Sequence, residues 1–276
     1  MRWFLIWLVC CTAPVWAAQL TIELGVTTRS FDSAQLLARS DVREIEIPAD
    51  VAFKRTMRYR AVPLRALLAG AGPEDHLLFV AADGFSAPIP MSLIDNRRGS
   101  SAWLAIEDPA HPWPPLPGKA QGAGPFYVVW TQPGLAGIGP ERWPYQLAAI
   151  RRQAPPADRF PMLAPDPALS AKDPVWRGFA VFQAQCLACH TLNGGGDAQL
   201  GPDLNLPHGP TEYLGDAFLR LYLRDPQALR RWPQARMPGF AVEVLPEGDL
   251  DALLAYLHHM TARKSPAQAR TSPARP

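Results

Sequence analysis

The spacing of hydrophobic and polar residues divides the chain into a strand-rich first part and a helical last part. Short apolar or alternating runs bounded by turn residues predict strands over 20–26, 42–47, 77–82 and 126–130. Asp83-Gly84 predicts a tight turn after the third strand, and Pro63 favours a short helix over 62–68. Apolar residues at helical spacing then predict helices over 175–185, 213–224 and 248–260.

A proline-rich segment separates these two parts. Residues 151–174 hold six prolines and no sustained period, which predicts an extended, semi-rigid linker. We therefore expect two domains: a strand-rich α+β domain over 19–150 and an all-α domain over 175–260. Residues 261–276 are basic, carry no acid and are rich in proline and alanine, so they predict a disordered tail.

The first eighteen residues have the pattern of a secretory signal peptide. Arg2 precedes an apolar run over 3–9, and small residues near position 17 provide a cleavage site. An uncleaved membrane anchor is the alternative, but the run is shorter than the roughly 20 residues that span a bilayer and is followed by Pro14. We expect a periplasmic protein with no transmembrane span after cleavage of residues 1–18.

Charge excludes one class of partner. The chain has 27 Lys and Arg residues against 25 Asp and Glu residues, and its basic tail is the kind of segment that stays solvated. A nucleic-acid interface needs basic residues clustered on an ordered face, so we expect no nucleic-acid partner.

The cysteines carry the clearest chemistry. Cys10 and Cys11 leave with the signal, so the exported chain keeps Cys186 and Cys189. An oxidising compartment would pair them as a disulfide unless another group takes both sulfurs. His190 follows at once, and two thiols on one helical turn can bond both haem vinyl groups while the imidazole reaches the iron.

Two other sites could use this cysteine spacing. A thioredoxin-like redox pair belongs in a βαβ context, which the helical pattern here does not provide. Half of a zinc site would need further cysteines, and the exported chain has none. Covalent haem is therefore the favoured interpretation.

The residues on both sides of the haem motif also form a pattern. They are Gly178 and Phe182 before it, Gly-Pro-Asp-Leu at 201–204 after it, Met237-Pro238, and Leu-Leu-Ala-Tyr at 253–256 in the last helix. On these motifs, residues 175–260 resemble a class I cytochrome c domain. In that family the first and last helices cross with a small residue against an aromatic one, which would place Gly178 near Tyr256.

The resemblance implies a set of ligands. One haem c would be bound covalently by Cys186 and Cys189, with His190 as the proximal iron ligand. Met237 matches the sixth ligand, in a loop stiffened by proline and glycine, and a Met ligand raises the reduction potential. Pro202 matches the proline whose carbonyl accepts the N–H of the proximal imidazole, a bond that fixes the ring.

Other residues could act at the same iron or at its edge. Bis-His ligation would draw the sixth ligand from His208, His258 or His259. Five arginines could neutralise haem propionates or meet an acidic partner, or could belong to a solvated helix face: Arg220, Arg224, Arg230, Arg231 and Arg236. Trp232 could pack in the core or donate its indole N–H to a propionate.

The first domain has a resemblance of its own. Residues 60–68, 82–85, 102–105 and 124–130 are similar to parts of the molybdopterin-binding domain of sulfite-oxidase-type enzymes, which is strand-rich. That family binds molybdenum through a cysteine thiolate, and residues 19–150 contain no cysteine. A fold can persist without its chemistry, so we expect no molybdopterin here.

These observations favour an electron-transfer protein over an enzyme. The expected function is a periplasmic c-type cytochrome that takes one electron at a time from a dehydrogenase and passes it towards a respiratory chain. Its first domain would dock a partner. The alternative is the electron-accepting part of a fused sulfite-dehydrogenase-like molybdenum enzyme, and a haem-based sensor would need an open iron site.

Overall fold

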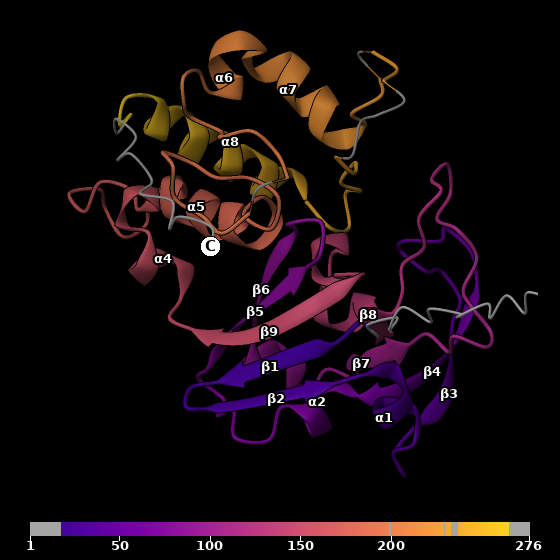
Figure 1. The fold of residues 1–276 in the computed structure, drawn as a ribbon. Helices are drawn as coiled ribbons and strands as arrows, with labels where there is room; N and C mark the ends of the chain where they lie inside the picture. Colours follow the sequence, from indigo (N-terminus) through magenta and orange to yellow (C-terminus); the bar gives the residue numbers. More distant parts are fainter. Residues whose placement is uncertain (1–17, 199, 229, 233–236, 265–276) are drawn as a thin grey trace, which may run out of the picture.

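The computed structural model describes residues 18–198, 200–228, 230–232 and 237–264 (Figure 1). The predicted signal peptide, apart from Ala18, and the tail from residue 265 lie outside the described residues. A strand-rich region with two sheets is followed by a helical region, which confirms the predicted order of the two fold types. No helix in the described part of the chain is long and apolar enough to cross a membrane.

The strands form a five-stranded and a four-stranded sheet within the described residues. The first sheet has the order β2 (Thr27–Phe31), β1 (Leu20–Leu24), β9 (Leu147–Gln153), β5 (His76–Ala81) and β6 (Ser86–Pro90). The second has the order β3 (Arg43–Ile47), β4 (Met57–Pro63), β7 (Ser101–Ile106) and β8 (Phe126–Thr131). Neighbouring strands are antiparallel except β1 and β9, which are parallel.

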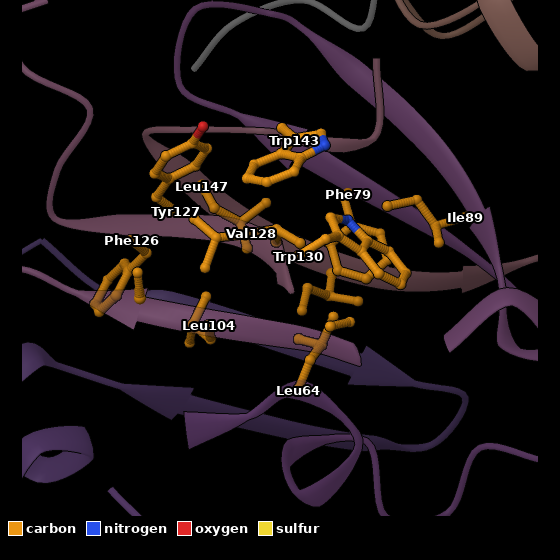
Figure 2. Packing of buried hydrophobic residues seen from close by; sticks show 14 of the residues in the cluster. Leu64, Phe79, Ile89, Leu104, Phe126, Tyr127, Val128, Trp130, Trp143 and Leu147 are labelled. Atoms are coloured by element: carbon orange, nitrogen blue, oxygen red, sulfur yellow. The ribbon is translucent and has the colours of Figure 1, made fainter. Parts of the chain in front are cut away.

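The core of this domain holds most of its large apolar side chains. Figure 2 shows Trp130 and Val128 of β8 among side chains contributed by both sheets. Trp130 is fully buried, and its indole N–H donates to the Arg142 carbonyl at 2.8 Å. This bond fixes the short 3-10 helix η2 (Pro140–Arg142) on the core. The remaining short elements are α1 (Ser33–Leu37), α2 (Leu64–Leu67), α3 (Met91–Ile94) and η1 (Pro133–Ala136).

The four predicted strands coincide with β1, β3, β5 and β8. The predicted turn joins β5 to β6: Gly84 has a φ of 92°, and the Asp83 side chain accepts from the Phe85 N–H at 3.1 Å. The predicted helix over 62–68 begins later, at Leu64, because Val62 and Pro63 still pair with β7 at the end of β4.

The helical region is built on two crossing helices, α5 (Pro174–Gln185) and α8 (Glu247–Thr261). The helix predicted over 213–224 is two elements, α6 (Pro210–Tyr213) and α7 (Gly215–Arg224). The chain turns between them at Gly215, whose φ is 69°, a value that favours glycine.

The predicted linker differs from the structure at both ends. Residues 151–153 complete β9, which pairs with β1 and β5, so the strand domain extends past its expected end. The following residues form α4 (Pro156–Arg159) and η3 (Pro161–Leu163), whose starting prolines supply the fixed φ of a first helical turn. Leu163 is fully buried in the helical core, and its carbonyl accepts from the Tyr256 hydroxyl at 2.7 Å. The segment therefore packs on the helical domain and is not an extended spacer.

Candidate haem-binding site

The Cys-X-X-Cys-His motif lies directly after α5. Cys186 caps the helix, and its carbonyl accepts from the backbone N–H groups of Cys189 and His190, at 3.1 and 2.9 Å. These bonds wind the five residues into one turn, which places both side chains that could form thioethers beside the imidazole. Neither cysteine forms a disulfide, and Cys186 is buried.

The His190 ring is held in a defined orientation. Its Nδ1 lies 2.8 Å from the Pro202 carbonyl oxygen. Since a carbonyl only accepts, Nδ1 carries the hydrogen and Nε2 keeps its lone pair for a metal. Burial lowers the pKa of His190, although the Pro202 bond opposes that shift. The structure thus shows the contact that the resemblance implied for Pro202.

Gly201 makes room for this ring. A Cβ atom added at Gly201 would lie 2.5 Å from His190 Cε1, closer than real Cβ contacts allow. The backbone at 201–202 therefore forms one wall of a cradle for the imidazole, and a larger residue at Gly201 would displace the ring.

Asp203 organises the loop after His190. The sequence pattern includes Asp203 in the Gly-Pro-Asp-Leu segment at 201–204 but predicts no role for it. Its carboxylate accepts from the Thr191 hydroxyl at 2.9 Å and from the Asn205 backbone N–H at 2.9 Å. The Asn205 side chain then donates to the Met260 carbonyl at 2.7 Å. This chain of bonds anchors the His190 loop to the end of α8.

The α5–α8 crossing has the geometry expected from the resemblance. A Cβ atom added at Gly178 would lie 2.7 Å from Tyr256 Cβ and would overlap the Ala252 carbonyl oxygen. The Tyr256 ring centroid lies 5.3 Å from that of Phe182 and 5.5 Å from that of Phe179. Glycine at 178 is what lets the two helix backbones approach this closely.

Met237 lies in the loop between α7 and α8. It is partly buried and packs against the hydrophobic cluster that contains Cys186. Arg224 supports the loop after it, because its guanidinium donates to the carbonyls of Phe240 at 3.0 Å and Leu245 at 2.7 Å. Residues 233–236, including Arg236, lie outside the described residues.

The three histidines considered for bis-His ligation have partners elsewhere. His258 Nε2 lies 2.7 Å from an Asp216 carboxylate oxygen. His259 Nε2 accepts from the Asp166 backbone N–H at 3.0 Å, and His208 is exposed beside Glu212. Met237 is the candidate that shares a cluster with Cys186.

The basic residues before Met237 divide into two kinds. Arg220 and Arg224 form ion pairs with Asp251 and Glu247 of α8, so they connect α7 to α8. Trp232 is 57% exposed, which excludes the core-packing interpretation, and the Arg230 guanidinium lies 4.9 Å from its ring centroid.

The strand domain covers one side of the haem motif, a contact that no sequence pattern indicated. Ala188 is 1% exposed and belongs to the hydrophobic core of the strand domain. Its carbonyl accepts from the Ser86 backbone N–H at 3.1 Å, at the start of β6. In Figure 1 the β5–β6 hairpin reaches towards α5, the helix that the haem motif follows. The two domains therefore meet at the residues between the two cysteines.

Comparison with known proteins identifies the helical region. Residues 175–261 match the family model for cytochrome c. This cytochrome c domain implies binding of haem c and indicates an electron-transfer haem protein. A search of curated proteins found no match for the chain. The strand domain has no matching family model, so its similarity to sulfite-oxidase-type enzymes gains no support beyond its two sheets.

The described residues fit a covalently bound haem. Two unpaired thiols lie on the turn that carries His190, and the imidazole presents Nε2 as its free nitrogen. Met237 provides a thioether on the same hydrophobic cluster. This is the donor set of a His/Met haem c site.

Proposed function

We propose that this protein is a periplasmic c-type cytochrome that carries one electron at a time. The observation that supports this most strongly is the turn that joins Cys186, Cys189 and His190, with the His190 Nδ1 hydrogen committed to Pro202. When bound, the haem supplies an iron that alternates between the ferric and ferrous states.

The chain's own residues would hold this group. Cys186 and Cys189 would form the two thioethers, and His190 and Met237 would supply the axial ligands. Pro202 orients the imidazole, and the Asp203 network keeps the loop in place. Burial lowers the pKa of His190, which favours the neutral ring, the form that ligates iron.

The proposed periplasmic location rests on the signal-peptide pattern of residues 1–18. The partners that fit are a dehydrogenase as electron donor and a respiratory-chain component as acceptor. The strand domain would add docking surface for one of them, and its packing on the Ala188 peptide would hold that partner beside the haem.

Covalent haem attachment tests this function. We would express the full chain together with a c-type haem maturation system. One haem per chain should stay attached after denaturation, and the native protein should take up one electron reversibly. Haem that is extracted from the denatured protein, or a chain without haem, would contradict the proposal.

The alternative is the electron-accepting part of a fused molybdenum enzyme. The resemblance of the strand domain to sulfite-oxidase-type enzymes is the observation that favours it. Residues 19–174 contain no cysteine, so they offer no thiolate that could bind molybdenum. Molybdenum in the purified, haem-loaded protein, measured by elemental analysis, would support the enzyme, and we expect none.

The sixth ligand can be tested separately. Met237→Ala should remove the ferric sulfur-to-iron absorption band, and Met237→His should lower the reduction potential because imidazole favours ferric iron more than a thioether does. Met162→Ala is the matched control, since Met162 is a partly buried methionine of the same region. A wild-type protein that lacks this band, or a band that persists in Met237→Ala, would mean that Met237 is not the ligand.

A further inference from the structure

The contact between the two domains brings a buried carboxyl group to the haem motif. Glu141 lies in η2, which packs beside β6, the strand that binds the Ala188 carbonyl. Glu141 is 7% exposed, although it is a residue type that is almost never buried without a partner. The function proposed above assigns it no role.

Glu141 is incompletely satisfied where it is buried. One oxygen, Oε1, lies 3.3 Å from Arg142 Nε. The other, Oε2, is buried and has no hydrogen-bond partner among the described residues. Burial raises the pKa of Glu141 to about 7, and the neighbouring Arg142 only partly opposes this shift. A carboxyl group in this state can lose or gain a proton near neutral pH.

The charge of Glu141 contributes to the raised pKa of both cysteines of the haem motif. Burial raises the pKa of the Cys186 and Cys189 thiols to about 12, and the Glu141 charge adds to the shift of each. Asp83, in the β5–β6 turn, also raises the pKa of Cys189. In the haem-loaded protein these thiols become neutral thioethers, so the field of Glu141 would act on the porphyrin that they hold.

The charged groups on the Arg142 side of this carboxyl group include Asp95, Arg97 and Arg98, which line one cavity with Arg142. Arg142 is its neighbour on η2, and Asp83 lies on the turn before β6. Strand β6, with the sequence Ser-Ala-Pro-Ile-Pro, has no titratable side chain. Low-dielectric burial strengthens the effect of a charge change at Glu141 on its surroundings.

We propose that the strand domain sets the reduction potential of the haem through Glu141, which takes up a proton when the iron is reduced. This inference rests on the proposed haem function. A carboxylate near a bound haem would stabilise ferric iron, which carries one more positive charge than ferrous iron. When a redox partner reduces the bound haem by one electron, the Glu141 carboxylate would take up one proton from solvent, so the net charge of the site would be conserved.

The sign of the pH dependence follows from this coupling. At a pH below the Glu141 pKa in both iron states, the group is neutral and has no effect on the potential. At higher pH it is charged in the ferric protein, so the potential falls as the pH rises. The potential falls by at most about 59 mV per pH unit, which for one electron corresponds to a tenfold change in the ferric-to-ferrous ratio.

The test compares full-length, haem-loaded Glu141→Gln with Glu46→Gln between pH 5 and 9. Glu46 is an exposed carboxylate on β3, paired with Arg58, so its loss is the matched control. At pH 8 we expect Glu141→Gln to favour ferrous iron about tenfold over wild type, with little difference at pH 5. Glu46→Gln should follow the wild type, and Glu141→Asp should retain the pH dependence.

Two outcomes would overturn the inference. One is a set of potential curves for wild type and Glu141→Gln that superimpose over the whole pH range. The other is a wild-type potential that does not depend on pH, together with a reduced-minus-oxidised infrared spectrum that has no protonated-carboxyl band. This second test needs only the wild type, so it remains decisive if Glu141→Gln does not fold. Absence of covalent haem would instead contradict the proposed function, so the two failures are distinguishable.

Discussion

Replacing both haem-motif cysteines, in Cys186→Ser/Cys189→Ser, should abolish covalent haem entirely. A hydroxyl is a far weaker nucleophile than a thiol, and serine at these positions forms no thioether. The folded turn would still present His190, so some haem could bind through the iron alone. Denaturation followed by separation of protein from pigment measures the difference: haem should stay with the wild-type chain and leave the variant.

The two other cysteines of the chain provide the matched control. Cys10→Ser/Cys11→Ser makes the same chemical change within the predicted signal peptide. If residues 1–18 are removed on export, the mature protein should be unchanged and carry one covalent haem. Covalent haem in the Cys186→Ser/Cys189→Ser protein would show that other atoms attach it, and the site assignment would be wrong.

The haem motif was predictable because its chemistry is local. One helical turn brings Cys186, Cys189 and His190 together whatever the rest of the chain does. The contacts of Pro202 with His190, and of Gly178 with α8, bridge longer separations in the sequence. They were predictable only through the resemblance to class I cytochromes c, which supplied partners that spacing alone does not determine.

The fold was predicted less completely where strands are short or polar. The sequence of β2, Thr-Thr-Arg-Ser-Phe, has no apolar alternation, and β6 contains two prolines. Strand β9 ends in Arg-Arg-Gln, which continues directly into proline-rich sequence. Pairing with neighbouring strands fixes these segments, and that pairing is not visible in a single strand's pattern.

The site at the domain contact had no sequence signal at all. Glu141 lies 45 residues before Cys186 in a Pro-Glu-Arg-Trp segment, and nothing in that segment marks it as buried. Its place near the thiols depends on how η2 packs against β6 and how Ala188 enters the strand-domain core. Such a contact is a property of the assembled fold.

A methyl group added at Gly178 should destabilise the cytochrome c domain by about 1–3 kcal/mol, the usual range for overpacking. Alanine is a better helix former than glycine by about 1 kcal/mol, so propensity alone predicts the opposite sign. The new Cβ would lie 2.6 Å from the Ala252 carbonyl carbon. Backbone of α8 cannot rotate away as a side chain can, so α5 and α8 would have to separate.

Gly248→Ala separates these two effects, because the same change is made on the partner helix where there is room. A Cβ at Gly248 would lie 3.6 Å from the Arg177 guanidinium, an ordinary contact with a flexible side chain. It should leave stability unchanged or raise it by up to about 1 kcal/mol. Urea unfolding followed by helical circular dichroism measures both variants. If Gly178→Ala were as stable as Gly248→Ala, the claim that the close approach of α5 and α8 requires glycine at position 178 would be wrong.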